Sequence, residues 1–103
     1  MGDQHRKARQ RGKQFERDVA NALGTRRVLK TGTMVPDIEH PVWRIDCKCR
    51  DTLSPFKAIT EAEEKYGSPA CIVWKRKGMN VDNSLVFFRF KDVKEWMSDE
   101  EAG

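Results

Sequence analysis

The chain has 103 residues, of which 20 are Lys or Arg and 16 are Asp or Glu, and its formal net charge is +4. This length fits one domain with one core, and it leaves no room for a two-domain enzyme or a deep cofactor pocket. Hydrophobic residues make up 38% and charged residues 35%, and the chain has three Trp and five Phe. It is therefore too rich in aromatic residues for a disordered chain and too polar for a membrane protein. We therefore expect a soluble globular protein with no membrane partner.

Positive charge is concentrated near the N-terminus. Residues 1–30 hold nine Lys and Arg against three acidic residues, a charge of +6, whereas residues 91–103 carry −3. A basic arm on a compact domain is typical of a protein that binds a polyanion, because neutralised phosphates release counterions. The alternative is a solvated helix face, and charge alone does not decide between them. We divide the chain into a basic arm (1–11), one domain (12–97) and an acidic tail (98–103).

The hydropathy and the cysteines indicate a cytoplasmic protein. No apolar run approaches the roughly 20 residues that a membrane helix needs, and the N-terminus lacks a signal-peptide pattern. Cys47, Cys49 and Cys71 form no zinc-type pattern, so we expect free thiols in a reducing compartment. As ligands for a soft metal they lack suitable partners, and we interpret Cys47 and Cys49 as small buried hydrophobic residues.

The first half of the chain is predicted to contain a helix and three strands. Apolar side chains at helical spacing over residues 12–23 predict an amphipathic helix with a basic polar side. A strand around 26–30, a loop and a short segment over 37–40 follow. Residues 42–50 alternate regularly between apolar and mostly charged side chains, which predicts a strand with one buried face and one charged face.

The second half is predicted to contain a helix, two strands and a final helix. Pro55 starts a helix that ends before Gly67, and the apolar residues 70–74 form a strand buried on both faces. A last strand over 85–90 precedes a short acidic helix around 93–97. The helical crossover makes the strands that flank it parallel. The predicted class is therefore α/β, with a mixed central sheet flanked by helices.

Asp37, Asp46 and Lys48 form the cluster that points to chemistry, with Glu16 reaching in from the first helix. Asp46 and Lys48 share a strand face at a separation of about 6 to 7 Å, and a turn at Pro41 would bring Asp37 beside Asp46. Two adjacent carboxylates repel each other unless a cation joins them, and Mg²⁺ accepts two carboxylates, water and phosphate oxygens. Lys48 would then help to orient and deprotonate an attacking water. The competing interpretation is a surface ion pair.

These residues carry a resemblance to a known family. Pro36-Asp37, eight intervening residues and then Asp46-Cys47-Lys48 resemble the PD-(D/E)xK signature of a large nuclease superfamily. Arg11-Gly12-Lys13-Gln14-Phe15-Glu16 and Thr31-Gly32-Thr33 are similar to the archaeal-type Holliday junction resolvases and their phage relatives. The likeness covers residues 9–90 and implies a single restriction-endonuclease-like nuclease domain with an αβββαβ core.

The resemblance also implies roles for individual residues. Asp37 and Asp46 would ligate Mg²⁺ or Mn²⁺ with help from the Cys47 backbone carbonyl, and Asp46 stands where the family more often has Glu. Lys48 would orient and activate the hydrolytic water, and Glu16 would complete the metal site directly or through water. The predicted DNA contacts lie in the arm, the first helix, the loop and a later basic corner: Arg9, Arg11, Lys13, Arg17, Thr31, Thr33, Lys75, Arg76 and Lys77.

The function implied is a metal-dependent DNA endonuclease that resolves four-way junctions. The family acts as a homodimer, because such a junction needs two symmetric nicks. The alternatives are a nickase or restriction-like nuclease of the same superfamily, and a nucleic-acid-binding module without turnover. We expect the protein in the cytoplasm beside the nucleoid, whether a cell or a phage encodes it.

Glu63 and the later aromatic residues have less specific interpretations. Glu63 is either a further site carboxylate or, as we favour, a helix-face ion-pair partner of Lys57 or Lys65. The aromatic side chains of the later strands are predicted to belong to the core or to a dimer interface rather than to stack on bases: Trp74, Phe88 and Phe90.

Overall fold

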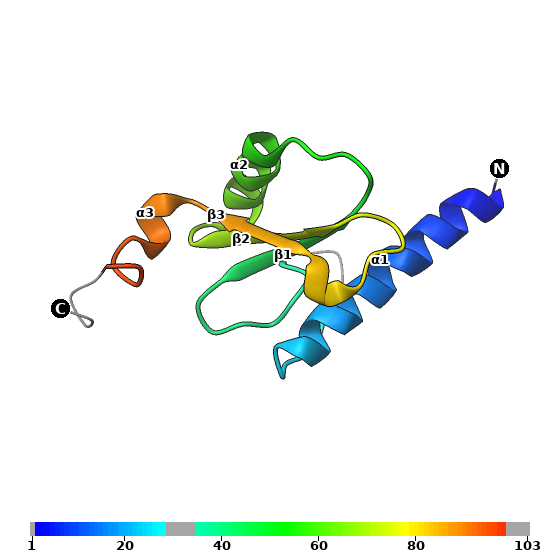
Figure 1. The fold of residues 1–103 in the computed structure, drawn as a ribbon, viewed down its shortest axis with the longest axis horizontal. Coiled ribbons are helices and arrows are strands. Elements are labelled where there is room, and N and C mark those ends of the chain that lie inside the picture. Colours follow the sequence, from blue (N-terminus) through cyan, green and yellow to red (C-terminus); the bar gives the residue numbers. More distant parts are fainter. Residues whose placement is uncertain (1, 29–34, 99–103) are drawn as a thin grey trace.

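A three-stranded mixed sheet lies between two helices in the computed structural model of the chain (Figure 1). The structure describes residues 2–28 and 35–98. Its elements, in chain order, are α1 (Gly2–Ala22), β1 (Arg44–Cys49), α2 (Pro55–Tyr66), β2 (Ala70–Lys75), the 3₁₀ helix η1 (Val81–Asn83), β3 (Leu85–Phe88) and α3 (Phe90–Val93).

The sheet has the order β1-β2-β3, and β2 is its central strand. β1 and β2 are parallel and are joined through α2, whereas β3 returns antiparallel to β2. A parallel pair needs a long crossover, which α2 supplies. The predicted α/β class, the mixed sheet and the parallel pair are confirmed.

Two hydrophobic clusters attach the helices to opposite faces of the sheet. Side chains alternate along a strand, so Ile45 and Cys71 face α1, where Phe15 is buried. Ile72, the next residue on β2, packs with Ile59 on the side of α2. The side chains of Asp46 and Lys48 alternate with Ile45 and therefore lie on the α2 side. Any site built on them lies between β1 and α2.

α1 begins at Gly2 rather than at residue 12, so the predicted start of the first helix is wrong. Residues 3–11 contain no proline and consist mostly of Arg, Lys, Gln and Ala, which lose little side-chain freedom in a helix. Gly12 does not interrupt it. The arm predicted at 1–11 is therefore continuous with the helix of the domain, and Figure 1 shows its first turns extending beyond the sheet.

The two strands predicted before β1 are reduced to single bridges in the described residues. Ile38 pairs antiparallel with Arg27 on one side and with Ile45 on the other. Residues 29 and 30 of the first predicted strand lie outside the described residues. Pro36 and Pro41, which flank the second segment, have no N–H to give to a ladder.

β1 and the C-terminal elements have different bounds from those predicted. β1 begins at Arg44 rather than at residue 42, because the N–H groups of Val42 and Trp43 donate to His40 Nδ1 instead of to a strand. β3 ends at Phe88, and α3 covers 90–93 rather than 93–97, because Arg89 is the N-cap that starts this helix early.

The aromatic residues divide between core and surface. Trp74 packs against the α2 cluster, and Phe88 packs against the α1 cluster with its ring centroid 5.4 Å from that of Trp43. Phe90 and Phe56 are 70% and 77% exposed. The helical spacing of Phe56 and Ile59 predicts that Phe56 lies on the inner side of α2, and the exposure of Phe56 shows that this prediction is wrong. Over residues 2–28 and 35–98, no helix combines the length and the apolar character needed to cross a bilayer.

Candidate active site

Asp37 and Asp46 form a buried carboxylate pair at the outer edge of β1. Their residues are 5% and 8% exposed. Asp37 Oδ2 accepts a hydrogen bond of 2.8 Å from the N–H of Cys47, and the N–H of Asp37 donates to the carbonyl of Ile45 at 3.0 Å. The turn at Pro41 therefore lays Asp37 directly along β1, where its side chain meets that of Asp46.

The electrostatics of the pair favour a bound cation. The pKa of Asp46 is raised to about 6, first by burial and then by a hydrogen bond with Asp37 and the negative charge of Asp37. Lys48 opposes this shift, with its Nζ 3.2 Å from Asp46 Oδ2. Asp46 and Lys48 do form an ion pair, but it is largely buried rather than on a solvated surface. At Asp46, the opposing effect of Lys48 is smaller than the combined effect of burial and Asp37, so the pKa stays raised.

Cys47 contributes its backbone to this edge and keeps its thiol neutral. Because the N–H and C=O of one strand residue point to the same side, the N–H bond to Asp37 directs the Cys47 carbonyl to the same edge. Burial, followed by the charges of Asp37, Glu16 and Asp46, raises the pKa of the Cys47 thiol well above its usual range. A protonated thiol is a poor metal ligand or nucleophile, so the carbonyl is the group that Cys47 can offer a hard cation.

The other cysteines are also free thiols, and Cys71 is buried whereas Cys49 is half-buried. Burial and the charge of Asp46 raise the pKa of Cys71 to about 12. Cys49 packs against the α1 cluster with Cys47. These surroundings agree with their interpretation as small buried hydrophobic residues.

Glu16 lies near the Cys47 thiol on the α1 side of the sheet and is paired with Arg27. It projects from α1, and its Oε1 accepts a hydrogen bond of 3.4 Å from Arg27 Nε. Its charge still raises the pKa of the Cys47 thiol. In the described ranges, 2–28 and 35–98, no group of three or more His, Cys, Asp or Glu side chains is arranged to hold a cation. The structure thus brings Asp37 and Asp46 together and pairs Glu16 with Arg27 on the side of α1.

The donor set fits a hard divalent cation. Mg²⁺ binds through one or two carboxylates and completes its shell with water and phosphate oxygens. Asp37 and Asp46 supply the carboxylates, and the Cys47 carbonyl is a third oxygen at the same edge. Mn²⁺ accepts the same oxygen ligands.

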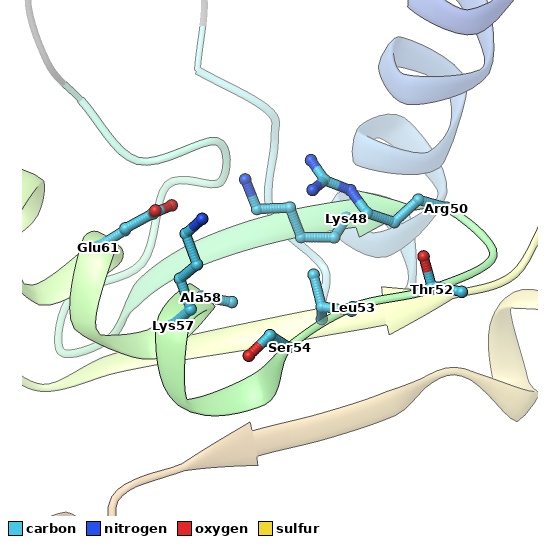
Figure 2. Close-up of a pocket in the computed structure, with 8 residues that line it drawn as sticks. All are labelled: Lys48, Arg50, Thr52, Leu53, Ser54, Lys57, Ala58 and Glu61. Atoms are coloured by element: carbon cyan, nitrogen blue, oxygen red, sulfur yellow. The ribbon is translucent and has the colours of Figure 1, made fainter.

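A cavity of about 520 Å³ adjoins this centre between β1 and the start of α2 (Figure 2). Lys48 lines the cavity and also contacts Asp46. The sequence patterns did not predict three residues of this cavity as site residues: Arg50, Ser54 and Lys57. Ser54-Pro55 marks the start of a helix directly after a basic strand end, a signal that would place Lys57 beside Lys48. The lining residues are Lys48, Arg50, Thr52, Leu53, Ser54, Lys57, Ala58 and Glu61.

The predicted DNA contacts on α1 are exposed. Arg9, Lys13 and Arg17 follow one another at intervals of four residues, so they share one side of the helix. All three, and Arg11, are exposed to solvent.

The remaining predicted contacts lie in two places. Thr31 and Thr33 lie outside the described residues. Lys75 is half-buried, donates to the carbonyl of Met79 at 2.8 Å and lies over the Phe15 ring. Its ammonium is therefore used within the fold, whereas Arg76 and Lys77 are exposed.

Glu63 connects α2 to Arg89, the residue that follows β3. Arg89 donates to both of its carboxylate oxygens at 3.1–3.3 Å and to Thr60 Oγ1 at 3.0 Å. The predicted ion pair with Lys57 or Lys65 is wrong, because a guanidinium from the end of β3 reaches Glu63 first. This contact is tertiary, so helical spacing could not reveal it.

Together these features define a small α/β protein with a buried carboxylate pair and a lysine at the edge of a mixed sheet. No protein-family model matches the chain, and no match was found among curated proteins or solved structures. Its function must therefore be argued from the side chains described above.

Proposed function

We propose that this protein is a metal-dependent DNA endonuclease with a PD-(D/E)xK fold that cuts phosphodiester bonds and prefers four-way junctions. The observation that carries the proposal is the buried pair of Asp37 and Asp46 with the ammonium of Lys48 3.2 Å from Asp46. Buried carboxylates side by side are costly unless a cation compensates them. Such a cost is expected at a site that acts on phosphate through a metal ion.

The residues of the pair have separate roles in this reaction. Asp37 and Asp46 hold the cation, and the Cys47 carbonyl offers a third oxygen at the same edge. A bound Mg²⁺ neutralises charge on the phosphate and makes a nearby water more acidic. Lys48 has three N–H donors, of which one faces Asp46. The other two are available to orient the attacking water and to stabilise the phosphate oxygens.

The exposed basic residues of α1 support the proposal that the substrate is a polyanion. Arg9, Lys13 and Arg17 form an exposed basic row on a helix that extends past the sheet (Figure 1). A row of this kind suits a phosphate backbone, which attracts Lys and Arg without regard to base sequence. Arg76 and Lys77 add exposed positive charge after β2.

We test the function on synthetic DNA. With Mg²⁺, the protein is expected to introduce paired nicks in a four-way junction, and with EDTA none. A linear duplex of the same sequence, cut more slowly, is the control for junction preference. If the duplex is cut faster than the junction, the protein is a general nuclease rather than a junction-resolving enzyme. Salt-sensitive binding with no cleavage of branched, duplex or single-stranded DNA under Mg²⁺ or Mn²⁺ assigns a binding module.

A groove beside β3 supports the proposed homodimer. It has a volume of about 420 Å³, is lined by Trp43, Val73, Phe88 and Trp96 among others, and opens at an edge strand of the sheet. Exposed apolar side chains surround it, among them Val86 and Trp96. Apolar surface of this kind marks an interface, and two symmetric nicks need two copies of the site.

Val86→Arg is expected to convert the dimer to a monomer, because it puts a charge into the apolar groove. Val42→Arg is the matched control, since Val42 is equally exposed at 52% but does not line the groove. Molecular mass is measured by light scattering after gel filtration. The groove is not the interface if both variants remain dimeric.

A further inference from the structure

Three cationic side chains converge on the cavity between β1 and α2. Lys48 comes from β1, Arg50 from the loop that follows it, and Lys57 from the first turn of α2. Figure 2 shows their charged ends on the same side of the cavity. Residues from three consecutive parts of the chain therefore direct positive charge to one place.

The charge of this cavity is not balanced by its own lining. Glu61 is the one acidic residue among the lining side chains, against Arg50, Lys57 and Lys48, and the ammonium of Lys48 is also paired with Asp46 outside the lining. Like charges held close together raise the free energy of the site, and an anion between them would lower it. The cavity therefore favours an anionic ligand.

The start of α2 supplies hydrogen-bond donors to the cavity in addition to the three cations. The Ser54 side chain makes no hydrogen bond to the helix it caps, so the helix does not use this hydroxyl. The first turn of α2 contains no acidic residue, and the N–H groups of a first turn have no partner within the helix. Hydroxyl, N–H and cationic donors together match the oxygens of a phosphate group.

We propose that this cavity binds a phosphate group and that, given the proposed nuclease function, the occupant is a DNA backbone phosphate next to the one that is cut. Lys48 lines the cavity and contacts Asp46, so the two places are adjacent. Arg50 and Lys57 then bind DNA without touching the reacting phosphate, so they hold the substrate and the transition state equally. Neither residue belongs to the carboxylate pair.

The decisive variant is Arg50→Gln combined with Lys57→Gln, and its control is Lys65→Gln combined with Lys94→Gln. Both double variants remove two charges, but Lys65 and Lys94 do not line the cavity. Junction DNA binding is measured in EDTA at several salt concentrations. The cavity variant is expected to bind about 10-fold more weakly, with its dependence on log salt about two units shallower. The control keeps the wild-type slope.

A second measurement separates DNA phosphate from free phosphate. Inorganic phosphate is titrated into the ¹⁵N-labelled protein, and the amide signals of Lys57 and Ala58 are followed. Shifts in the wild type that disappear in the cavity variant, together with its weaker DNA binding, support the proposal. The same shifts with unchanged DNA binding overturn the DNA assignment in favour of a soluble phosphate. Unchanged DNA affinity and no phosphate shift overturn the phosphate site altogether.

Cleavage rates distinguish this inference from the nuclease proposal. If the wild type cuts DNA, the cavity variant is expected to raise KM about 10-fold with kcat changed less than about 3-fold, which a general loss of structure would not produce. An equal fall of kcat in both double variants contradicts this role in substrate binding. If the wild type cuts nothing, the nuclease proposal fails, and binding in EDTA still decides whether the cavity takes phosphate.

Discussion

Lys48→Ala is expected to lower the rate of Mg²⁺-dependent DNA cleavage by roughly 10²–10⁴-fold, a far larger effect than its weakening of DNA binding. The ammonium lies 3.2 Å from Asp46 Oδ2 and forms an ion pair with this carboxylate. Its loss removes the donor that orients the attacking water, and a positioned proton-transfer group contributes about this much to rate. Single-turnover cleavage of a four-way junction measures the effect.

Lys65→Ala is the matched control for Lys48→Ala, because it removes an exposed lysine of α2 outside the cavity. It is expected to cleave as the wild type does. Circular dichroism confirms that both variants are folded. If Lys48→Ala cleaves at the wild-type rate, Lys48 serves only as an ion-pair partner of Asp46, and the proposed catalytic centre is wrong.

Local patterns explain why the parallel pair was predictable. Pro55 and Gly67 mark the ends of α2 by backbone chemistry that needs no knowledge of the rest of the fold. A helix that leads from one apolar strand to the next leaves a parallel pair as the favoured arrangement. α2 matched its prediction at both ends, and β2 differed only at its C-terminal residue.

The burial of Asp46 was not predictable from its own strand. Alternation along residues 42–50 places Asp46 with Arg44 and Lys48 on a charged face, which reads as solvated. In the structure Asp46 is 8% exposed, because that face lies on the side of α2 and because Asp37 approaches from the neighbouring segment. Both neighbours are tertiary, so the sequence could locate the charged residues but not their desolvation.

The convergence of Lys48 and Lys57 on one cavity and the Arg89–Glu63 pair were unpredictable for the same reason. Lys57 is nine residues from Lys48 in the sequence, and only the turn into α2 brings both to one cavity. Arg89 reaches Glu63 from the end of β3 across the sheet edge. Charged residues with long side chains choose among several partners, and the choice depends on packing that spacing along one helix does not contain.

Asp46→Asn is expected to stabilise the metal-free protein at pH 8 while abolishing cleavage. The pKa of Asp46 is raised to about 6 by burial and by Asp37, so the ionised form present at pH 8 weakens the folded state relative to the unfolded one. An asparagine cannot ionise, and its amide can donate to Asp37. The gain in the free energy of unfolding is about 1–3 kcal/mol, since one pKa unit corresponds to about 1.4 kcal/mol.

The pH dependence of wild-type stability gives the sign of this effect. A folded-state pKa near 6 lies above the unfolded value of about 3.9. The contribution of Asp46 to stability is therefore fully present below about pH 4 and is lost as the pH rises through 6. Urea unfolding in EDTA between pH 4 and pH 8 is expected to show this loss in the wild type and not in Asp46→Asn.

Asp51→Asn is the control for Asp46→Asn, because Asp51 is an exposed aspartate five residues later on the chain. Its unfolding curve is expected to follow the wild type at each pH.

Mg²⁺ is expected to stabilise the wild type at pH 8 and to have little effect on Asp46→Asn, because a ligand of the folded state adds to stability in proportion to its occupancy. If Asp46→Asn is less stable than the wild type at pH 8 and cuts DNA normally, then Asp46 serves only as a structural partner of Lys48. If Asp46→Asn is instead more stable than the wild type and does not cleave DNA, then Asp46 lowers the stability of the fold and its role is to bind the cation.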